Sequence, residues 1–500
     1  MVRKFLQYIN GWKGIALICY MWLILMDYAV VYIDFTSPEA QKRLYAVSVA
    51  EVILIALIYI CPRLLRFAES LKIEHSDGAF TQNQKSGLFI RTWAVTFAVL
   101  FVMYLIFYPG GFSPDNVSQY AQASGQINYN DWHPVLHTLI FYTLPLKITG
   151  GWIGSIVLFQ IIIFSSAFAY TICVLAEYGN IKYAKLITIY TLISPASLGF
   201  LLFPMKDSAF AIASMLLMTF TARIYFSRGE WINSTKHIIL FAVILAAATI
   251  FRHNAILFTL PLLFCVIFYA RKFRRVLLPV IFIALVLFVK MPLYSSLNVE
   301  KPGYRQFETL GIPIAVIAEA ADKTPERLDD DIVAFAQNLD KDKVEEMGYA
   351  RILEMSMRCV KASPMVCLKK VLDVTDMVYG IAGIFIGGNV PYIRENSYGL
   401  DMKGISFLQR LYWCYSYGTM LLLKHIFWHL GVLHLALIVM FLAKASLRKL
   451  FILLPMFIYN FGTMLLLKID DFRFFYYSLL IAPLLILILL QEDRKDLTLI

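Results

Sequence analysis

Charged residues are scarce in this chain. They make up 16% of its 500 residues, whereas 60% are hydrophobic, and a soluble domain carries about a quarter charged residues. No polar linker interrupts the first 290 residues. This composition excludes an ordinary soluble enzyme and a disordered chain. Cysteine is also rare, with seven in the whole chain, which excludes a disulfide scaffold. What remains is an integral membrane protein with many spans.

Long apolar stretches are what the sequence has in abundance. A membrane-spanning helix needs about 20 mostly apolar residues. We therefore predict an all-α integral membrane protein with about twelve transmembrane helices. The predicted spans lie near residues 12–33, 43–61, 88–108, 152–175, 183–203, 208–226, 236–252, 255–270, 276–293, 426–443, 450–467 and 474–491. The first stretch has no small-residue cleavage site after it, which favours a retained span over a signal peptide.

The few charges indicate a topology. Basic residues gather at alternate ends of the predicted spans, with Lys42 and Arg43 as the main exceptions, which by the positive-inside rule places both termini on the cytoplasmic side of a cell membrane. These residues are Arg3, Lys4, Lys13, Arg63, Arg66, Lys72, Lys85, Lys182, Lys185, Arg223, Arg228, Arg271, Lys272, Arg274, Arg275, Lys444, Arg448, Lys449, Arg494 and Lys495. Residues 300–403 hold 13 basic and 17 acidic side chains, a net charge of −4. The rest of the chain therefore has a net charge of +15, which gives the total of +11. The surplus lies on the inner side, which argues against a nucleic-acid partner.

This topology divides the chain into three parts. Residues 1–293 form a transmembrane domain of nine spans with an outer loop at 109–151. Residues 294–425 have helical periodicity, so we expect a small helical extracytoplasmic layer there. Residues 426–500 contain three further spans and a short cytoplasmic tail.

The first outer loop is polar and rich in glycine and aromatic residues. It contains PGGFSPDN at 109–116 and NDWHP at 130–134. Ser113 followed by Pro114 is a good helix start, and that alone could explain Asp115 as an acid in a first helical turn. His133 and His137 lie four residues apart, as a metal pair would, but no third ligand is close in the sequence, which favours structural histidines.

Four other outer corners carry charged residues where short turns meet the membrane. They are Lys206-Asp207, Arg252-His253-Asn254, Lys290, and Asp470-Asp471 with Arg473. Ionisable groups at a membrane edge are costly and mark functional sites. A turn or an ion pair, such as Lys206 with Asp207, would explain any one corner. Four on one side favour a shared polar cavity, in which Asp115 takes a proton and the cations neutralise a lipid-linked phosphate.

In layout and in four short motifs, the chain resembles the GT-C superfamily of membrane glycosyltransferases, and within it a group of bacterial polytopic proteins. The motifs are PGGFSPDNVSQYAQASG with NDWHPVLHT, FPMKDSAF, FRHNA and DDFRFFYY. The resemblance implies a polyprenyl-phosphate-linked sugar donor. It also implies transfer on the outer face, usually with inversion, to a cell-envelope glycan, lipid or protein. Asp115 then matches the general base, and Arg473 matches a ligand of the lipid phosphate.

The chain departs from that superfamily in two ways. Many members have paired acids in the first loop, whereas Asp115 is followed by Asn116 and the next acid is Asp131. The loop also follows the third span rather than the first. These departures put the base assignment and any metal requirement in doubt: the residues identify no certain cofactor, and a divalent metal such as Mg²⁺ or Mn²⁺ stays an open alternative.

The candidate site residues follow from these motifs. The catalytic candidates are Asp115, Asp131 and His133. The candidates for substrate and phosphate binding are Gln119, Lys206, Asp207, Arg252, His253, Asn254, Lys290, Asp471, Arg473 and Tyr476.

Two other functions stay open. A polymerase or ligase acting on undecaprenyl-pyrophosphate glycans would depend on Arg252, Arg305 and Arg473 more than on Asp115. A lipid-linked sugar flippase or secondary transporter would use charges within spans, for which Asp27 and Glu51 are the candidates. Transporters tend to contain internal repeats, and we find none.

Overall fold

A computed structural model of the chain describes residues 4, 7–32, 40–73, 81–271, 273–301, 303, 305–381, 390–467 and 471–491. Within these residues the secondary structure is helical, with two isolated β-bridges and no sheet. The predicted all-α class is therefore confirmed. Several residues used in the predictions lie outside the described part, namely Arg3, Lys272, Asp470, Arg494 and Lys495.

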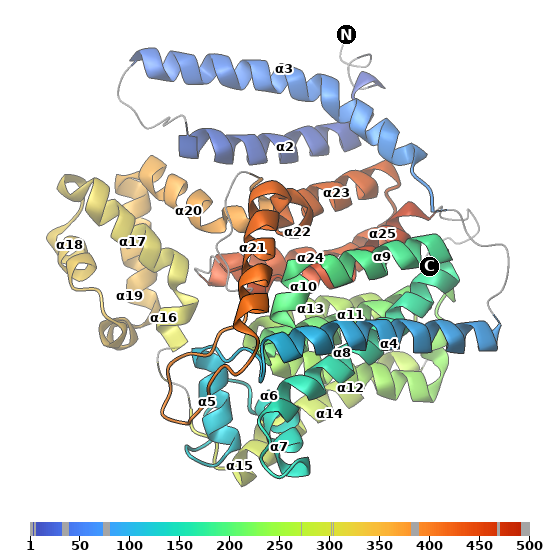
Figure 1. Cartoon of the computed structure of the whole chain (residues 1–500). Helices are drawn as coiled ribbons and strands as arrows, with labels where there is room; N and C mark the ends of the chain where they lie inside the picture. The colour runs from blue at the N-terminus through green and yellow to red at the C-terminus, as the bar shows by residue number, and fades with distance from the viewer. Residues whose placement is uncertain are drawn as a thin grey trace.

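Six helices in the described part of the chain are long and apolar enough to cross a membrane, which is the architecture of a multi-pass membrane protein. Their segments are Val47–Ser70 of α3 (Ala40–Ser70), α4 (Gln82–Ile106), α8 (Gly154–Tyr178), α11 (Lys206–Phe226), Arg274–Ser296, and α24 (Leu447–Leu466). The fifth segment joins α14 (Arg274–Phe288), a π-helical turn (Val289–Leu293) and α15 (Tyr294–Ser296). Helices α4, α8 and α11 pack in sequence from one side of the bundle to its middle (Figure 1).

Shorter apolar helices complete the bundle. They are Gly11–Leu25 of α2 (Gly11–Tyr32), α6 (Val135–Thr138) with α7 (Leu144–Ile148), α12 (Thr235–Phe251), α13 (Ile256–Ile267), α23 (Leu430–Ala443) and α25 (Tyr477–Leu490). Every predicted span except 183–203 has a counterpart among the long and short apolar helices. The count of about twelve spans stays a prediction, because six helices among the described residues are long and apolar enough to cross a membrane.

Two segments differ from the expected pattern. The stretch predicted as a span at 183–203 is divided into α9 (Ile181–Ile193) and α10 (Pro195–Phe200). Pro195 has no N–H and forces an extended conformation on the residue before it, which ends α9. Conversely, residues 135–148 of the predicted outer loop form an apolar helical segment that begins directly after Pro134.

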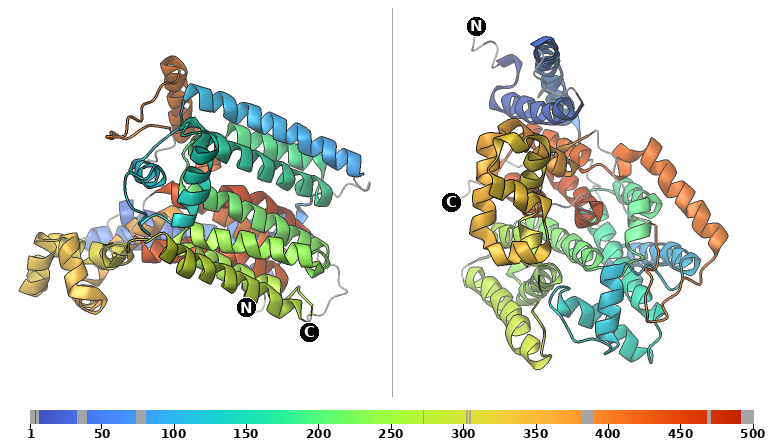
Figure 2. Two further views of the ribbon diagram at one scale, coloured as in Figure 1. Left: turned by 90° about the horizontal axis from the view of Figure 1, so that it is seen from below. Right: turned by 90° about the vertical axis from the view of Figure 1, so that its left-hand side faces the viewer.

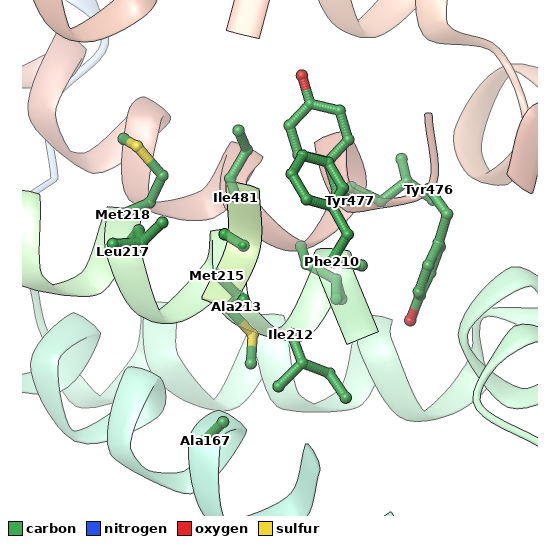
Figure 3. Close-up of a cluster of buried hydrophobic side chains, with 14 of the residues drawn as sticks. Ala167, Phe210, Ile212, Ala213, Met215, Leu217, Met218, Tyr476, Tyr477 and Ile481 are labelled. Carbon is green, nitrogen blue, oxygen red and sulfur yellow. The ribbon is translucent and has the colours of Figure 1, made fainter. Parts of the chain in front are cut away.

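Helix α11 is the centre of the bundle. It packs against α8, α12 and α25, and Figure 3 shows its Phe210 and Met215 beside Tyr477 and Ile481 of α25. In its most apolar stretch 78% of the residues are buried, against 11% in Arg274–Ser296. The segment Arg274–Ser296 is both apolar and exposed, so we expect it to face lipid. Helix α11 is buried instead, so its polar residues are held away from the lipid.

A helical lobe stands beside the bundle. It contains α16 (Arg305–Thr309), α17 (Gly311–Lys323), α18 (Asp330–Gln337), α19 (Lys341–Ala362) and α20 (Pro364–Tyr379). The lobe has its own buried apolar cluster, which includes Ile317, Ile332, Ile352 and Met355. Figure 2 shows the lobe projecting past one end of the long helices, while α20 packs against α23 and α24. Farther along the chain, α21 (Ser406–Leu422) packs against α4 and α10.

Because neighbouring helices run antiparallel, the charged residues at the helix ends form two groups, one at each end of the bundle. Helices α4 and α12 end, and α11 and α25 begin, near the short helix α5 (Pro114–Ala123). The charged corners therefore meet at this end. At the other end, Glu177 pairs with Lys85 at 2.7 Å and with Arg223 at 3.0 Å.

Candidate functional site

The loop before α5 is fixed to the corner that carries Lys206. Gly111 N–H donates to the carbonyl of Leu202 at 2.9 Å, and a Cβ on Gly111 would collide with the ring of Phe203. Only glycine allows this close approach. The glycines of the PGG motif thus bring two corners together that are about ninety residues apart in the chain.

A buried hydrogen-bond chain then sets the start of α5. As predicted, α5 begins at Pro114 after Ser113. The Ser113 N–H donates to Asn116 Oδ1 at 3.1 Å, and Asn116 Nδ2 donates to the Tyr142 hydroxyl at 2.7 Å. That hydroxyl donates in turn to the carbonyl of Pro204 at 2.8 Å. Asp115 is therefore held in a first helical turn beside Lys206, which follows Pro204 by two residues.

A second pair of charges is closed off from solvent. Arg252 forms an ion pair with Asp207, and both side chains are 3% exposed. Arg252 Nε also donates to Asn254 Oδ1 at 3.1 Å, and its guanidinium lies 4.2 Å from the centre of the Phe474 ring. The local pairing of Lys206 with Asp207 considered above is thus replaced by a pair between α11 and the end of α12.

Arg473 is the more accessible arginine. Its guanidinium lies 2.8 Å from Asp471 and 3.7 Å from Asp115, and the side chains of Arg473 and Asp115 are 25% and 32% exposed. Asp471 Oδ1 also accepts from the Arg473 N–H at 3.0 Å. Burial raises the pKa of Asp471, although Arg473 opposes that shift. This local turn aims Arg473 at the first turn of α5.

The electrostatics keep Asp115 ionised. Burial alone would raise the pKa of its carboxyl, but the nearby positive charges of Lys206, Arg473 and Arg252 lower it below its usual value. His133 lies 3.5 Å from Lys206, between their nitrogens, and is 3% exposed. Burial, reinforced by Lys206, lowers the pKa of His133 to about 3, so this imidazole is neutral at neutral pH. An ionised carboxylate among cations can orient a hydroxyl and accept its proton.

Asp131 belongs to a neighbouring cluster. Its carboxylate accepts from Lys290 Nζ at 3.0 Å and from the Tyr294 hydroxyl at 2.8 Å. His253 Nε2 lies 2.9 Å from the backbone carbonyl of Asp131. Two donors on one carboxylate favour a positioning role for Asp131 over that of a free base.

Three other candidates have partners within the protein core. Gln119 Nε2 lies 2.8 Å from His137 Nδ1 and donates to Thr138 Oγ1 at 2.9 Å. Asn254 Nδ2 donates to Thr463 Oγ1 at 2.8 Å. The ring of Tyr476 packs against Phe200 in the core shown in Figure 3. The structure thus brings together Asp115, His133, Lys206, Asp207, Arg252, Asp471 and Arg473, whereas Gln119 and Tyr476 stabilise the surrounding fold.

Sequence reasoning missed two members of these clusters. Phe474 lies between the two arginines, with its ring centre 4.2 Å from the Arg252 guanidinium and 5.1 Å from that of Arg473. Its position directly after Arg473 was the available signal. Tyr294 follows Lys290 by four residues, a spacing that puts both on one helical face and could have revealed their contact.

Metal ligands do not converge here. Among the described residues, no group of three or more His, Cys, Asp or Glu side chains is arranged to hold a metal ion. The spaced pair His133 and His137 separates, with His133 beside Lys206 and His137 beside Gln119.

Comparison with known proteins adds nothing to this geometry, since no protein family model, curated protein or solved structure matches the chain. Any function must therefore be argued from the charged and polar residues that the structure brings together, here called the charge cluster: Asp115, His133, Lys206, Asp207, Arg252, Asp471 and Arg473.

Proposed function

We propose that this protein is a membrane glycosyltransferase that takes a sugar from a polyprenyl-phosphate-linked donor. Its acceptor would be a cell-envelope glycan, a lipid or a protein on the extracytoplasmic side. The observation that carries the proposal is the pair of Asp115 and Arg473, an ionised carboxylate and a partly exposed cation 3.7 Å apart, at one end of helices able to span a membrane.

The donor phosphate would bind to Arg473 and Lys206. Guanidinium groups bind phosphate oxygens in a bidentate way, and Arg473 has solvent access for this. Arg252 would act indirectly, because Asp207, Asn254 and Phe474 already occupy its guanidinium. The polyprenyl chain would lie against the apolar outer faces of the bundle.

The reaction would be a single displacement. The acceptor hydroxyl attacks the anomeric carbon, and the bond from that carbon to the phosphate oxygen breaks. The electron pair leaves with the phosphate, where Arg473 and Lys206 stabilise the added charge. The hydroxyl proton passes to Asp115. Binding of an anionic phosphate would also offset the cations that lower the pKa of Asp115, which makes its carboxylate a better base when the donor is present.

The proposed topology puts this reaction outside the cytoplasm. The end of the bundle opposite the cluster carries Lys85, Arg223 and Arg271, as the positive-inside rule requires of a cytoplasmic side. Both termini would then be cytoplasmic, and the helical lobe would be extracytoplasmic.

The alternatives have less support. A polymerase depending on Arg252 would need that arginine to contact substrate, yet it is buried against Asp207. A transporter would depend on Asp27 and Glu51, which lie on α2 and α3, at the edge of the bundle far from α5 in Figure 1.

The direct test uses Asp115→Asn in the full chain, reconstituted in nanodiscs with a panel of undecaprenyl-phosphate sugars. Release of undecaprenyl phosphate should fall by about 10²- to 10⁴-fold, the usual contribution of a general base, while undecaprenyl phosphate still binds. Asp342→Asn, in the first turn of α19 on the exposed lobe, is the matched control and should keep full turnover. Unchanged turnover in Asp115→Asn would refute the proposal.

A further inference from the structure

A polar groove of about 680 Å³ lies next to the charge cluster. Its lining is dominated by amide and hydroxyl side chains and one indole, namely Ser118, Gln122, Gln126, Asn128, Asn130 and Trp132. The charged lining residues in the described part of the chain are Glu300 and Lys341, which have opposite signs. The groove is therefore polar without a strong net charge.

The walls of this groove are held in place by backbone hydrogen bonds. The Glu300 N–H donates to the carbonyl of Tyr129 at 2.8 Å, and the Asp131 N–H donates to the carbonyl of Glu300 at 3.0 Å. Asn128 Nδ2 donates to Glu300 Oε1 at 2.9 Å. The segment that leads from the bundle into the lobe is thus paired with the first polar loop. A groove with such walls is formed before a ligand arrives, which lowers the entropy cost of binding.

Helix α5 connects the groove to Asp115. Residues Asp115, Ser118 and Gln122 are spaced by three and four, so they share one helical face, and the last two line the groove. The adjacent face of α5 is buried through Asn116 and Gln119. At about 1.5 Å per residue, Gln122 lies about 10 Å along the helix from Asp115, which is the length of about two sugar rings.

The loop at 128–133 makes the same connection from the other side. Asn128, Asn130 and Trp132 line the groove, whereas the alternate residues Asp131 and His133 contact Lys290 and Lys206. The groove and the charged residues therefore lie on opposite sides of this loop.

We propose that this groove binds a neutral oligosaccharide, and that it holds the acceptor glycan with one hydroxyl at Asp115. Amide and hydroxyl side chains both donate and accept hydrogen bonds, as sugar hydroxyls do, and the half-buried indole of Trp132 offers an apolar face to a sugar ring. The balanced charge of the lining favours an uncharged ligand over an anionic one. This inference rests on the proposed function, and it selects a glycan among the acceptors considered there.

Ligand-observed saturation-transfer NMR on the full chain in nanodiscs tests this groove. Nanodiscs are needed because a glycoside detergent would itself supply sugar groups. The probes are neutral trisaccharides of hexose, pentose and N-acetylhexosamine units, together with an uncharged Gly-Ser hexapeptide. We expect at least one trisaccharide to bind, and Trp132→Ala to weaken that binding by at least about fivefold while Trp132→Phe retains most of it.

A second tryptophan provides the matched control. Trp413 is exposed on α21 and lines a different groove of about 480 Å³, so Trp413→Ala should leave trisaccharide binding unchanged. The inference is overturned if no trisaccharide binds, if only the peptide binds, or if Trp132→Ala binds as well as the unaltered chain. If the unaltered chain bound a trisaccharide through Trp132 but Asp115→Asn still transferred sugar at the normal rate, the proposed function would fail while the groove assignment stood.

Discussion

Two arginine–carboxylate pairs stand side by side in this protein, and they differ in access to solvent. Arg252 and Asp207 are both almost fully buried, whereas Arg473 and Asp115 keep a quarter to a third of their side-chain surface exposed. The chemistry of the two pairs is the same. The difference indicates that the closed pair joins helices and that the open pair is available to a ligand.

The hydrogen bonding supports this division. The Arg252 guanidinium forms an ion pair with Asp207 and donates hydrogen bonds to Asn254 Oδ1 at 3.1 Å and to the Phe474 carbonyl at 3.5 Å. Arg473 lies 3.7 Å from Asp115, which is beyond a normal hydrogen bond. Asp471 holds the Nε of Arg473 at 2.8 Å, so a phosphate oxygen could approach the terminal nitrogen that faces Asp115 while the pair with Asp471 stays in place.

The largest effect should come from breaking the closed pair. Arg252→Met leaves Asp207 ionised and buried without its partner, which costs about 3–5 kcal/mol of the free energy of unfolding. The double variant Arg252→Met with Asp207→Leu removes both charges and should recover most of that loss, because apolar replacements of a buried pair are often neutral. Thermal unfolding in nanodiscs at a fixed scan rate measures both. A single variant as stable as the unaltered chain would contradict the structural role of this pair.

Breaking the open pair should instead affect ligand binding. Arg473→Ala removes a charge-assisted hydrogen bond to phosphate, worth about 1.5–3 kcal/mol, so the Kd for undecaprenyl phosphate should rise by about 10- to 150-fold. The thermal midpoint should change little. Arg358→Ala, which removes a partly exposed arginine paired with Asp331 in the lobe, is the control and should leave the Kd unchanged. Equal affinity in Arg473→Ala would place the phosphate elsewhere.

The open pair also predicts a pH dependence. The pKa of Asp115 is lowered by Lys206, Arg473 and Arg252, so the acidic limb of kcat/KM should lie below pH of about 4, the ordinary carboxyl value. Removing one of these charges in Arg473→Met should move that limb to higher pH. The sign for stability is the same: ionised Asp115 stabilises the fold above its unfolded pKa, and this contribution is lost as pH falls through the folded value.

A pH series of kcat/KM for both proteins measures the shift. An acidic limb that stays in place in Arg473→Met would show that another group titrates there. A limb for kcat at higher pH than that for kcat/KM would support the idea that bound phosphate raises the pKa of Asp115.

Much of this arrangement could be predicted from the sequence, because the few charged residues of an apolar chain are costly inside a membrane and are expected at the ends of its helices. The helical class, the start of α5 at Pro114 and the grouping of the charged corners at one end all follow from local patterns. The pairing within the cluster could not be predicted. Asp207 is adjacent to Lys206 in the chain but pairs with Arg252 on another helix, and only the packing of α11 against α12 decides this. Pro195 is the reverse case. This proline was a local signal for a helix end, but the prediction gave more weight to the apolar run around it and placed one span over residues 183–203.

The smallest expected effect concerns a third pair of intermediate exposure. Lys290 and Asp131 are 32% and 12% exposed, and the Tyr294 hydroxyl donates to the same carboxylate. Tyr294→Phe removes that one hydrogen bond, so the fold should lose about 1 kcal/mol, while Lys290 keeps the carboxylate in place. Turnover should change by less than about fivefold, because a loss of 1 kcal/mol in positioning corresponds at most to a factor of about five. A fall as large as that expected for Asp115→Asn would instead make Asp131 the base, and the open pair would then be a ligand site alone.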